Sequence, residues 1–241
     1  MYEDNYYQIE SFEKNNWWYR ARRDLLDKIL KSLNTLFHNT LDAGCGVGSN
    51  FEVLTKYSKN VYGIDISDDA IELCSCKNYR KLTKMSLLDF KLDVEFDLVA
   101  CMDVLEHVDD DMEAVKNLSS HIRTNGILIV SVPAHRFLWN DNDRFGGHLR
   151  RYALNDVRRI VNANNLTILK LSYWNQFMFV PSSIYCIVCL LRKERRLKNN
   201  LTLIPNVFNE VLYKILKAEN RLFIKFGLLE GVSIFCICQK Q

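Results

Sequence analysis

The segment 41–48 reads Leu-Asp-Ala-Gly-Cys-Gly-Val-Gly, and it constrains the fold of this chain more than any other stretch. Glycines at 44, 46 and 48 allow a tight turn and let the backbone come close to a ligand. An apolar residue precedes the loop and an amphipathic run follows it, so the pattern predicts a strand, a loop and a helix. In a doubly wound α/β sheet, such a loop lies at the carboxyl end of a strand, where ligands bind.

A second strand is predicted at 61–65, and it ends in an acid, Asp65. Asp65 follows Gly44 by 65 − 44 = 21 residues. This is about the spacing at which an acid meets the ribose in nucleotide-binding crevices. A carboxylate can accept hydrogen bonds from both ribose hydroxyls, so Asp65 is predicted to hold the ribose, with Ile66 beside it.

The spacing of the glycines bears on the kind of nucleotide. A dinucleotide-binding loop has the pattern G-x-G-x-x-G, whereas this loop has G-x-G-x-G with an acid, Asp42, just before it. An acid at this point suits a cationic ligand better than a pyrophosphate. The pattern therefore disfavours a nicotinamide-dependent oxidoreductase.

The loop resembles motif I of class I S-adenosylmethionine-dependent methyltransferases, and two further segments follow in the expected order. Residues 96–108 are similar to motif IV of the branch that includes ubiquinone and menaquinone methyltransferases, and residues 126–133 to the fifth strand. The resemblance covers about 10–175 and the final strand. It implies a methyltransferase that uses S-adenosylmethionine. A non-catalytic protein that binds this cofactor is the alternative of another class.

The expected architecture is an α/β, doubly wound, Rossmann-like sheet of seven strands, with a helical insertion between the last two. By the resemblance, the final strand is antiparallel. Four regions are expected: a lid helix at 1–38, the cofactor-binding core at 39–173, a helical cap at 174–231 and the last strand at 232–241. Strands are predicted at 39–42, 61–65, 82–86, 96–101, 126–132, 166–173 and 232–238, and helices at 18–33, 49–57, 68–76, 109–123, 155–163 and 206–226.

The resemblance assigns further cofactor contacts. Ser86 aligns best with the stretch that contacts adenine, and Cys101 with Met102 follows the fourth strand near the expected sulfonium. The aromatic and basic run 16–23 offers Arg20 for the cofactor carboxylate, or else it forms an amphipathic helix with its arginines in water. The predicted cofactor residues are Asp42, Gly44, Gly46, Gly48, Asp65, Ile66, Ser86, Leu87, Cys101, Met102 and Arg20.

The loop 133–152 follows the fifth strand and faces the expected acceptor. Its residue types suit acid–base chemistry and anion binding. His148 is the leading candidate for a base, ahead of His135 and Asp143, and a loop-stapling role for His148 is the alternative. In the resembled family the pair Glu106-His107 begins a helix and is often structural. An O-methylation is expected, with N-methylation of an amino sugar or amine as the alternative. The predicted acceptor-binding residues are Trp139, Arg150, Arg151 and Tyr152.

Composition limits the partners. The net charge is +3 with no long basic arm, so no nucleic acid is expected. Eight cysteines lie mostly in apolar runs, and Cys186-x-x-Cys189 has no second pair, so we expect free thiols, a cytoplasmic protein and no metal. Residues 177–191 carry no charge and are followed by a basic cluster up to 198. This segment predicts either a buried cap helix or peripheral contact with the inner face of a membrane, and a small or lipid-linked acceptor suits both.

Overall fold

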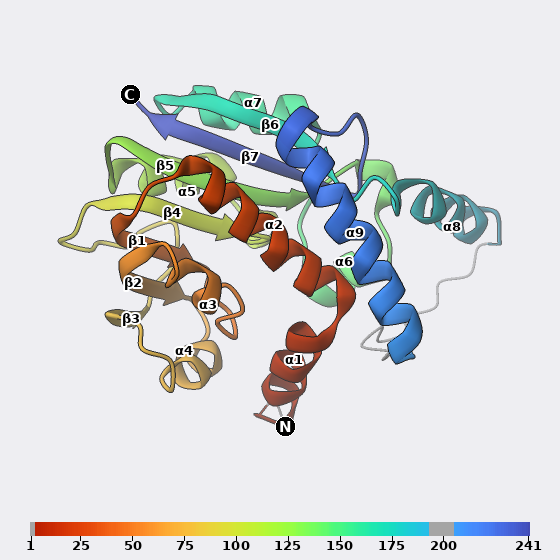
Figure 1. The fold of residues 1–241 in the computed structure, drawn as a ribbon, viewed down its shortest axis with the longest axis horizontal. Helices are drawn as coiled ribbons and strands as arrows, with labels where there is room; N and C mark the ends of the chain where they lie inside the picture. Colours follow the sequence, from red (N-terminus) through yellow and green to blue (C-terminus); the bar gives the residue numbers. More distant parts are fainter. Residues whose placement is uncertain (1–2, 193–204) are drawn as a thin grey trace.

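The computed structural model describes residues 3–192 and 205–241, and these form a seven-stranded sheet in the order β3-β2-β1-β4-β5-β7-β6 (Figure 1). The pairs among β1 to β5 are parallel, and β7 is antiparallel to both β5 and β6. The predicted fold class is therefore confirmed, including the antiparallel last strand. The strands are β1 Phe37–Ala43, β2 Ser58–Asp65, β3 Lys81–Lys84, β4 Phe96–Met102, β5 Ile122–Pro133, β6 Leu166–Trp174 and β7 Ser233–Lys240.

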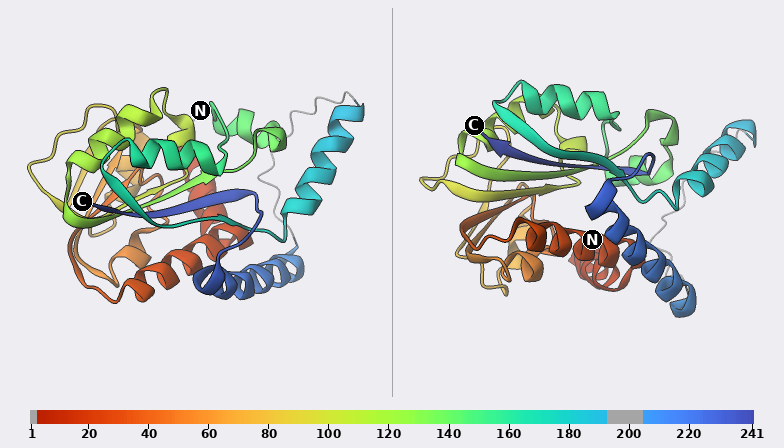
Figure 2. Two further views of the ribbon diagram at one scale, coloured as in Figure 1. Left: turned by 90° about the horizontal axis from the view of Figure 1, so that it is seen from above. Right: turned by 45° about the horizontal axis from the view of Figure 1, so that its top comes forward.

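Helices cover both faces of the sheet (Figure 2). On one face, α5 and α7 bury their apolar stripes against the sheet, and on the other face α2, α3 and α9 do so. The central strand β4 is buried along its whole length, as expected for a strand covered on both faces. The helices are α1 Glu3–Asn15, α2 Trp17–Leu33, α3 Phe51–Leu54, α4 Asp68–Cys74, α5 Asp111–Ser120, α6 Asp141–Gly146, α7 Leu154–Asn162, α8 Phe179–Arg192 and α9 Asn206–Phe226, with 3-10 turns η1 Leu105–His107 and η2 Arg136–Leu138.

Several helix ends differ from the sequence prediction. Helix α4 begins at Asp68 as predicted, and the Ser67 hydroxyl caps it by accepting a hydrogen bond from the Ala70 amide at 3.3 Å. Helix α7 begins at Leu154, one residue before the predicted start, and the amide of Ala153 donates to Asp156 at 3.0 Å. The predicted helix 49–57 shortens to α3, because the chain turns directly into β2. Helices α1 and α6 were not predicted.

The segment between β6 and β7 is helical, as its length required. Its second helix, α9, lies against α2 and buries Leu216 and Phe223 in the core below the sheet, so this part is a layer of the domain and not a cap over the site (Figure 1). Helix α8 projects from the sheet and contacts η2. The basic cluster predicted after α8 lies outside the described residues, apart from Arg192 at its start. In the described parts of the chain, none of the helices has the length and apolar character needed to cross a bilayer.

A buried hydrogen-bond network joins α9, α2 and β6. The Asn220 amide oxygen accepts from the indole N–H of Trp174 at 2.8 Å, and its nitrogen donates to the Ala21 carbonyl and to Asp24, each at 2.8 Å. Both Trp174 and Asn220 are fully buried. The indole N–H of Trp174 would remain unpaired without the amide, because water does not reach it, whereas Asp24 also pairs with Lys28.

We expect Asn220→Ala to lower the free energy of unfolding by about 1–3 kcal/mol, since it leaves the buried indole N–H of Trp174 unpaired. Urea unfolding followed by circular dichroism measures this change. The matched control is Asn155→Ala on the exposed side of α7, whose side chain accepts a hydrogen bond only from nearby Arg158. Equal stability of the two variants would contradict the role assigned to Asn220.

Candidate active site

The carboxyl ends of β1, β2 and β4 meet where the strand order reverses, and the glycine loop leaves β1 at this edge. Gly44, Gly46 and Gly48 all have φ between +53° and +73°, a conformation that side chains disfavour. A Cβ on Gly44 would lie 2.5 Å from a methyl carbon of Val104, whereas a Cβ on Gly46 would meet no atom within 4 Å. The backbone at Gly46 therefore faces open space that a ligand can approach.

Asp65 ends β2 directly beside this loop. Its Oδ2 accepts from the Gly46 amide at 2.8 Å and its Oδ1 accepts from the Ser67 amide at 2.9 Å. One carboxylate thus ties the glycine loop to the start of α4. Each oxygen retains a lone pair for a further donor. Ile66, the next residue, is 70% exposed at the same edge.

Asp42 lies beneath the loop and is buried. Its carboxylate accepts from the Tyr79 hydroxyl at 2.9 Å and from the Asn50 amide at 3.3 Å. Burial raises the pKa of Asp42 to about 6, although both hydrogen bonds act in the opposite direction. The role of Asp42 toward a cationic ligand stays a prediction; in the structure its carboxylate is held by two neutral donors, Tyr79 and Asn50.

The stretch after β3 reaches the same edge. The Met85 amide donates to the Asp65 carbonyl at 2.9 Å, and Ser86 closes a turn in which its hydroxyl accepts from the Leu88 amide at 3.2 Å. Ser86 is half-buried beside Asp65, whereas the Leu87 side chain packs in the core under α5. Of the predicted pair, only Ser86 offers a side chain at the edge.

Cys101 and Met102 differ from the prediction that they line the site. Because neighbouring side chains on a strand point to opposite faces, Cys101 is buried on the α5 side and Met102 on the α2 side. The first residue past the strand, Asp103, reaches the edge instead. It has φ +56°, and its amide donates to the Ser131 carbonyl at 2.9 Å.

Arg20 does not reach the site. It pairs with Glu210 at 2.5 Å and lies over the ring of Tyr213, both on α9. The buried guanidinium of Arg22 points to the site instead and pairs with Asp103. The helical periodicity of the sequence could have predicted that Arg22 is buried, because it lies on the same face of the helix as the buried residues Leu25 and Leu26.

The surroundings of Arg22 stabilise the positive charge of its guanidinium group. Burial acts to lower its pKa, but Asp103 and Glu13 outweigh this effect and raise it. The rings of Trp18 and Tyr19 flank the guanidinium at 5.1 and 5.2 Å from their centroids. The Nε of Arg22 has no partner among the described residues, so this group retains a donor. Helix α1 closes over the same place through a hydrogen bond between Glu13 and Ser49 of the glycine loop.

The loop after β5 brings His148 and Asp143 together. His148 Nδ1 lies 2.9 Å from Asp143 Oδ1, and Arg151 Nε donates to the same oxygen at 2.8 Å. Burial acts to raise the pKa of Asp143, but the hydrogen bonds from His148 and Arg151 outweigh it and lower the pKa. The arrangement orients the imidazole and leaves its Nε2 facing away from the carboxylate.

The His148 loop joins the end of β4. The Leu149 amide donates to the Glu106 carbonyl at 2.7 Å, and the rings of His107 and His148 stand edge to face with centroids 4.8 Å apart. Burial and His148 lower the pKa of His107, while Asp103 and Asp65 act in the opposite direction. The histidine pair therefore lies beside the turn that follows β4. Glu106 and His107 lie in the 3-10 turn η1, not at the start of the following α-helix.

Other predicted residues lie beside this cluster with different partners. His135 stacks on Tyr173 at 4.7 Å and lies 3.1 Å from Glu230, and burial lowers its pKa. A hollow of about 520 Å³ is lined by all four predicted acceptor residues, Trp139, Arg150, Arg151 and Tyr152, together with Arg136 and Arg159. Two acids also line it, so four arginines face two aspartates.

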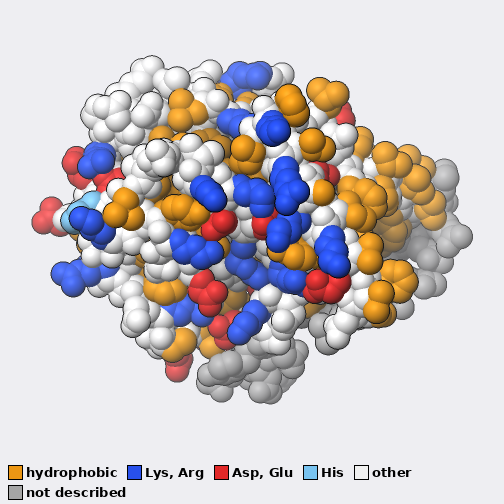
Figure 3. Space-filling model, viewed as in Figure 1, with side chains coloured by type: hydrophobic (Ala, Val, Ile, Leu, Met, Phe, Trp, Pro, Cys, Tyr) orange, Lys and Arg blue, Asp and Glu red, His pale blue; other side chains and the backbone are white. Residues whose placement is uncertain are grey.

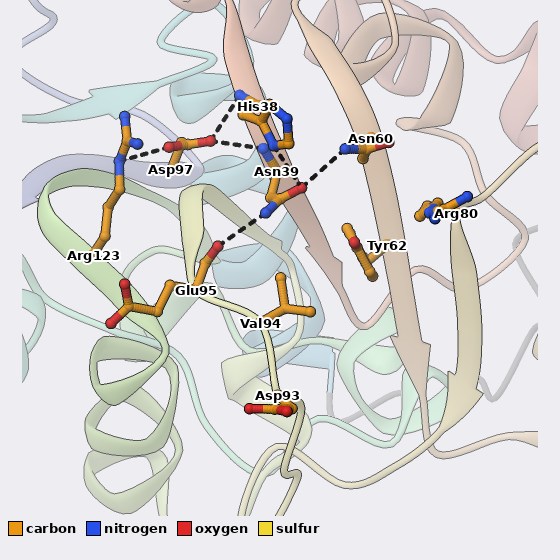
Figure 4. A pocket seen from close by; sticks show the side chains of 10 residues that line it. All are labelled: His38, Asn39, Asn60, Tyr62, Arg80, Asp93, Val94, Glu95, Asp97 and Arg123. Atoms are coloured by element: carbon orange, nitrogen blue, oxygen red, sulfur yellow. Dashed lines mark hydrogen bonds and ion pairs between the residues drawn. The ribbon is translucent and has the colours of Figure 1, made fainter.

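A second hollow, of about 570 Å³, lies at the opposite edge, where the strands begin (Figure 4). Asp97 lines this hollow. Its carboxylate accepts hydrogen bonds from the backbone amides of His38 and Asn39, each at 2.7 Å, and forms an ion pair with Arg123 at 2.6 Å. Through these bonds the carboxylate of Asp97 connects β4 to β1 and β5. We assign this hollow no part in the site.

Comparison with known proteins identifies the family of the chain. A family model described as a methyltransferase domain matches residues 17–171. The chain is 29% identical over 145 residues to the ubiquinone biosynthesis O-methyltransferase of Rickettsia felis, and the match covers 52% of this chain and 59% of that relative. The chain therefore spans less than two thirds of the length of this curated relative.

Solved structures show the same fold. The N-methyltransferase NodS from Bradyrhizobium japonicum, in complex with S-adenosylhomocysteine, superposes with a TM-score of 0.55 at 22% identity, covering 70% of this chain and 90% of that chain. An S-adenosylmethionine-dependent methyltransferase from Clostridium acetobutylicum superposes with a TM-score of 0.59 at 14% identity, covering 92% of each chain.

The buried Asp42 makes a testable contribution to pH dependence. Its pKa rises from 3.8 to about 6 on folding, so between these values the native protein binds a proton that the unfolded chain releases. The free energy of unfolding of the wild type, relative to Asp42→Asn, should therefore fall as the pH rises from about 4 to about 6, by about 3 kcal/mol in total.

Urea unfolding of both proteins at a series of pH values measures this difference. Asp68→Asn, on the exposed first turn of α4, is the control and should show no such trend. Parallel stability curves for the wild type and Asp42→Asn would refute the assignment.

Proposed function

Because this chain belongs to the methyltransferase-domain family, we propose that it transfers the methyl group of S-adenosylmethionine to an oxygen of a small or lipid-linked acceptor. One observation carries the proposal. A glycine loop tied to a strand-end acid and a carboxylate-oriented histidine stand at the same edge of the sheet, where β1, β2 and β4 end. The first pair suits a nucleoside, and the second suits an acceptor that must lose a proton.

The cofactor is proposed to lie across the carboxyl ends of β1 and β2. Asp65 would accept the ribose hydroxyls, and Gly46 would let the backbone approach the methionyl part. Arg22, in place of Arg20, would bind the cofactor carboxylate, since its Nε is unpaired and its charge is held by neighbouring aromatic rings. Ser86 would contact the adenine.

The transfer itself needs alignment and a place for the proton. The acceptor oxygen attacks the methyl carbon, the carbon–sulfur bond breaks with its electron pair left on sulfur, and S-adenosylhomocysteine leaves. Most of the rate enhancement comes from holding the three atoms in line. The hydroxyl proton must leave as well, and His148, oriented by Asp143, is the group placed to assist at this step.

The oriented histidine favours oxygen over nitrogen as the methylated atom. A hydroxyl gains nucleophilicity when a base takes its proton, whereas a neutral amine can attack without one. His148 with Asp143 would be of little use to an amine acceptor. N-methylation of an amine or amino sugar remains the alternative outcome of the tests below, and binding without turnover is the other.

Two surface regions suggest that the acceptor has an anionic part and an apolar part. The arginines around the 520 Å³ hollow suit a carboxylate or phosphate, although Arg150 and Arg151 also hold Asp111 and Asp143. Helix α8 exposes a stripe in which Val180, Ile184 and Ile187 are 60%, 57% and 53% exposed (Figure 3). This stripe could contact an apolar tail or the lipid surface that holds it.

The two halves of the cofactor can be tested separately. We expect Asp65→Ala to weaken binding of both S-adenosylhomocysteine and 5′-methylthioadenosine by about tenfold or more, because both carry the ribose. Arg22→Gln should weaken binding of S-adenosylhomocysteine alone, because 5′-methylthioadenosine lacks the carboxylate. Isothermal titration calorimetry measures all four affinities.

Arg20→Gln is the matched control, since Arg20 pairs with Glu210 away from the site. Its affinities should equal those of the wild type. If Arg22→Gln weakens both ligands alike, Arg22 supports the fold and does not bind the carboxylate. If the wild type binds neither ligand, the proposed function fails.

The proposed role of His148 predicts that its substitution lowers the rate of methyl transfer without changing cofactor affinity. With 3,4-dihydroxybenzoate as a probe that has a carboxylate and two hydroxyls, His148→Gln should lower methyl transfer by about 10²-fold or more and leave the affinity for S-adenosylhomocysteine unchanged. Transfer of a labelled methyl group measures the rate, with benzylamine, which has no hydroxyl, as the amine probe. Wild-type turnover in His148→Gln, or transfer to benzylamine alone, would refute base-assisted O-methylation.

A further inference from the structure

We propose that the hollow between η2, the loop after α6 and helix α7 binds the phosphate group of the methyl acceptor, which is a phosphate monoester that also carries a hydroxyl. The volume of the hollow, about 520 Å³, is in the range of sites that hold small molecules. Its lining includes four arginines and an apolar wall, namely Arg136, Arg150, Arg151 and Arg159 with Trp139 and Leu149. The link to the acceptor rests on the proposed function, whereas binding of the phosphate does not.

Two of the four arginines are available to a ligand. The guanidinium of Arg159 has no hydrogen-bond or ion-pair partner among the residues that the structure describes. Arg136 contacts Asp156 at 3.4 Å, and its side chain is 79% exposed. A guanidinium in this state offers its planar fork of N–H donors to an anion. These two groups form the exposed rim of the hollow.

The other two arginines are held in place by acids. Arg150 forms an ion pair with Asp111 at 3.0 Å. The side chain of Arg151 is only 10% exposed, and its guanidinium donates to Asp143 at 2.8 Å and to the Ala134 carbonyl at 3.0 Å. Each guanidinium retains N–H groups that these bonds do not use. Because both are oriented before a ligand arrives, binding orders fewer side chains and costs less entropy.

The arrangement of the arginines favours a phosphate over a carboxylate. They come from three separate segments around one hollow: η2, the loop after α6 and α7. A planar carboxylate has two oxygens, whereas a phosphate monoester has three that point in different directions and can accept from all three segments. The lining is also positive, since the four arginines face Asp111 and Asp156, and it stays positive when the buried Asp143 is counted. A phosphate monoester, with close to two negative charges at pH 7, gains more from this excess than a carboxylate with one.

The hollow adjoins the histidine that is proposed to assist the transfer. Arg151 Nε and His148 Nδ1 both bond to Oδ1 of Asp143, at 2.8 and 2.9 Å. A phosphate held by the arginines would therefore leave the rest of the acceptor beside His148, with the half-buried Trp139 as an apolar wall. The arginines bind and position the acceptor and take no part in the proton transfer.

Calorimetric titration with phenyl phosphate, benzoate and inorganic phosphate tests the site without any turnover. We expect the wild type to bind phenyl phosphate about tenfold more tightly than benzoate, because of the additional oxygen and charge. It should bind inorganic phosphate more weakly than phenyl phosphate, because only the ester brings a ring to the apolar wall. Replacing Arg136 and Arg159 together by glutamine should weaken binding of phenyl phosphate by about tenfold or more. Both side chains are exposed, so this double variant should fold.

The matched control replaces Arg144 and Arg158 together by glutamine. It removes the same two charges from exposed positions on α6 and α7 that do not line the hollow. Its affinity for phenyl phosphate should equal that of the wild type. An equal loss in the two double variants would reveal a general effect of charge and overturn the proposal. Absence of binding, or an affinity for benzoate or inorganic phosphate equal to that for phenyl phosphate, would also overturn it.

Methyl transfer tests the link to the acceptor. In the wild type, 3,4-dihydroxyphenyl phosphate should be a better acceptor than 3,4-dihydroxybenzoate, and loss of Arg136 and Arg159 should remove this preference. Equal transfer to both compounds by the wild type would overturn the assignment. Titration with S-adenosylhomocysteine in the same samples separates the two proposals. If it binds and phenyl phosphate does not, this inference fails and the proposed function stands, whereas the reverse result refutes the proposed function and leaves the phosphate site.

Discussion

The alignment of β1, β2 and β4 in parallel register supports every part of the site. Asp42, Asp65 and Asp103 come at or just past the carboxyl ends of these three strands, so strand pairing alone gathers three acids at one edge. The backbone amides of Gly46 and Ser67 then bond to Asp65, which fixes the loop that a nucleoside would approach. A shift of register by one residue would turn these side chains to the other face and separate them.

Buried charge at this edge is balanced in a different way at each acid. Asp103 pairs with Arg22, and Asp143 pairs with both Arg151 and His148. Asp42 has only neutral donors, and burial raises its pKa to about 6. The side-chain oxygens of Glu106 have no hydrogen-bond partner among the described residues, and burial, together with the neighbouring Asp103, raises the pKa of this carboxyl well above its ordinary value. Burial therefore favours the neutral form of Glu106.

The acceptor side is less constrained than the cofactor side. Helix α8 and the loop after β5 carry exposed apolar and basic side chains, which fit an acceptor with both characters. Because many functions share this fold, the fold alone does not identify the acceptor. The proposed role of His148 would narrow the choice, since an imidazole oriented by Asp143 fits chemistry on an atom that must lose a proton.

The sequence alone was enough to predict the sheet, its antiparallel last strand, the glycine loop and Asp65, because these depend on local spacing within one strand–loop–helix unit. Three placements depend on the fold. Arg22 and not Arg20 points toward the strand ends, because the contact with α9 decides which face of α2 turns inward, and Asp103 and not Cys101 reaches the edge, because the end of β4 decides which side chain leaves the sheet. The side chains of Glu106, His107 and His148 come from segments about forty residues apart, and only packing of the loop onto η1 brings them close together.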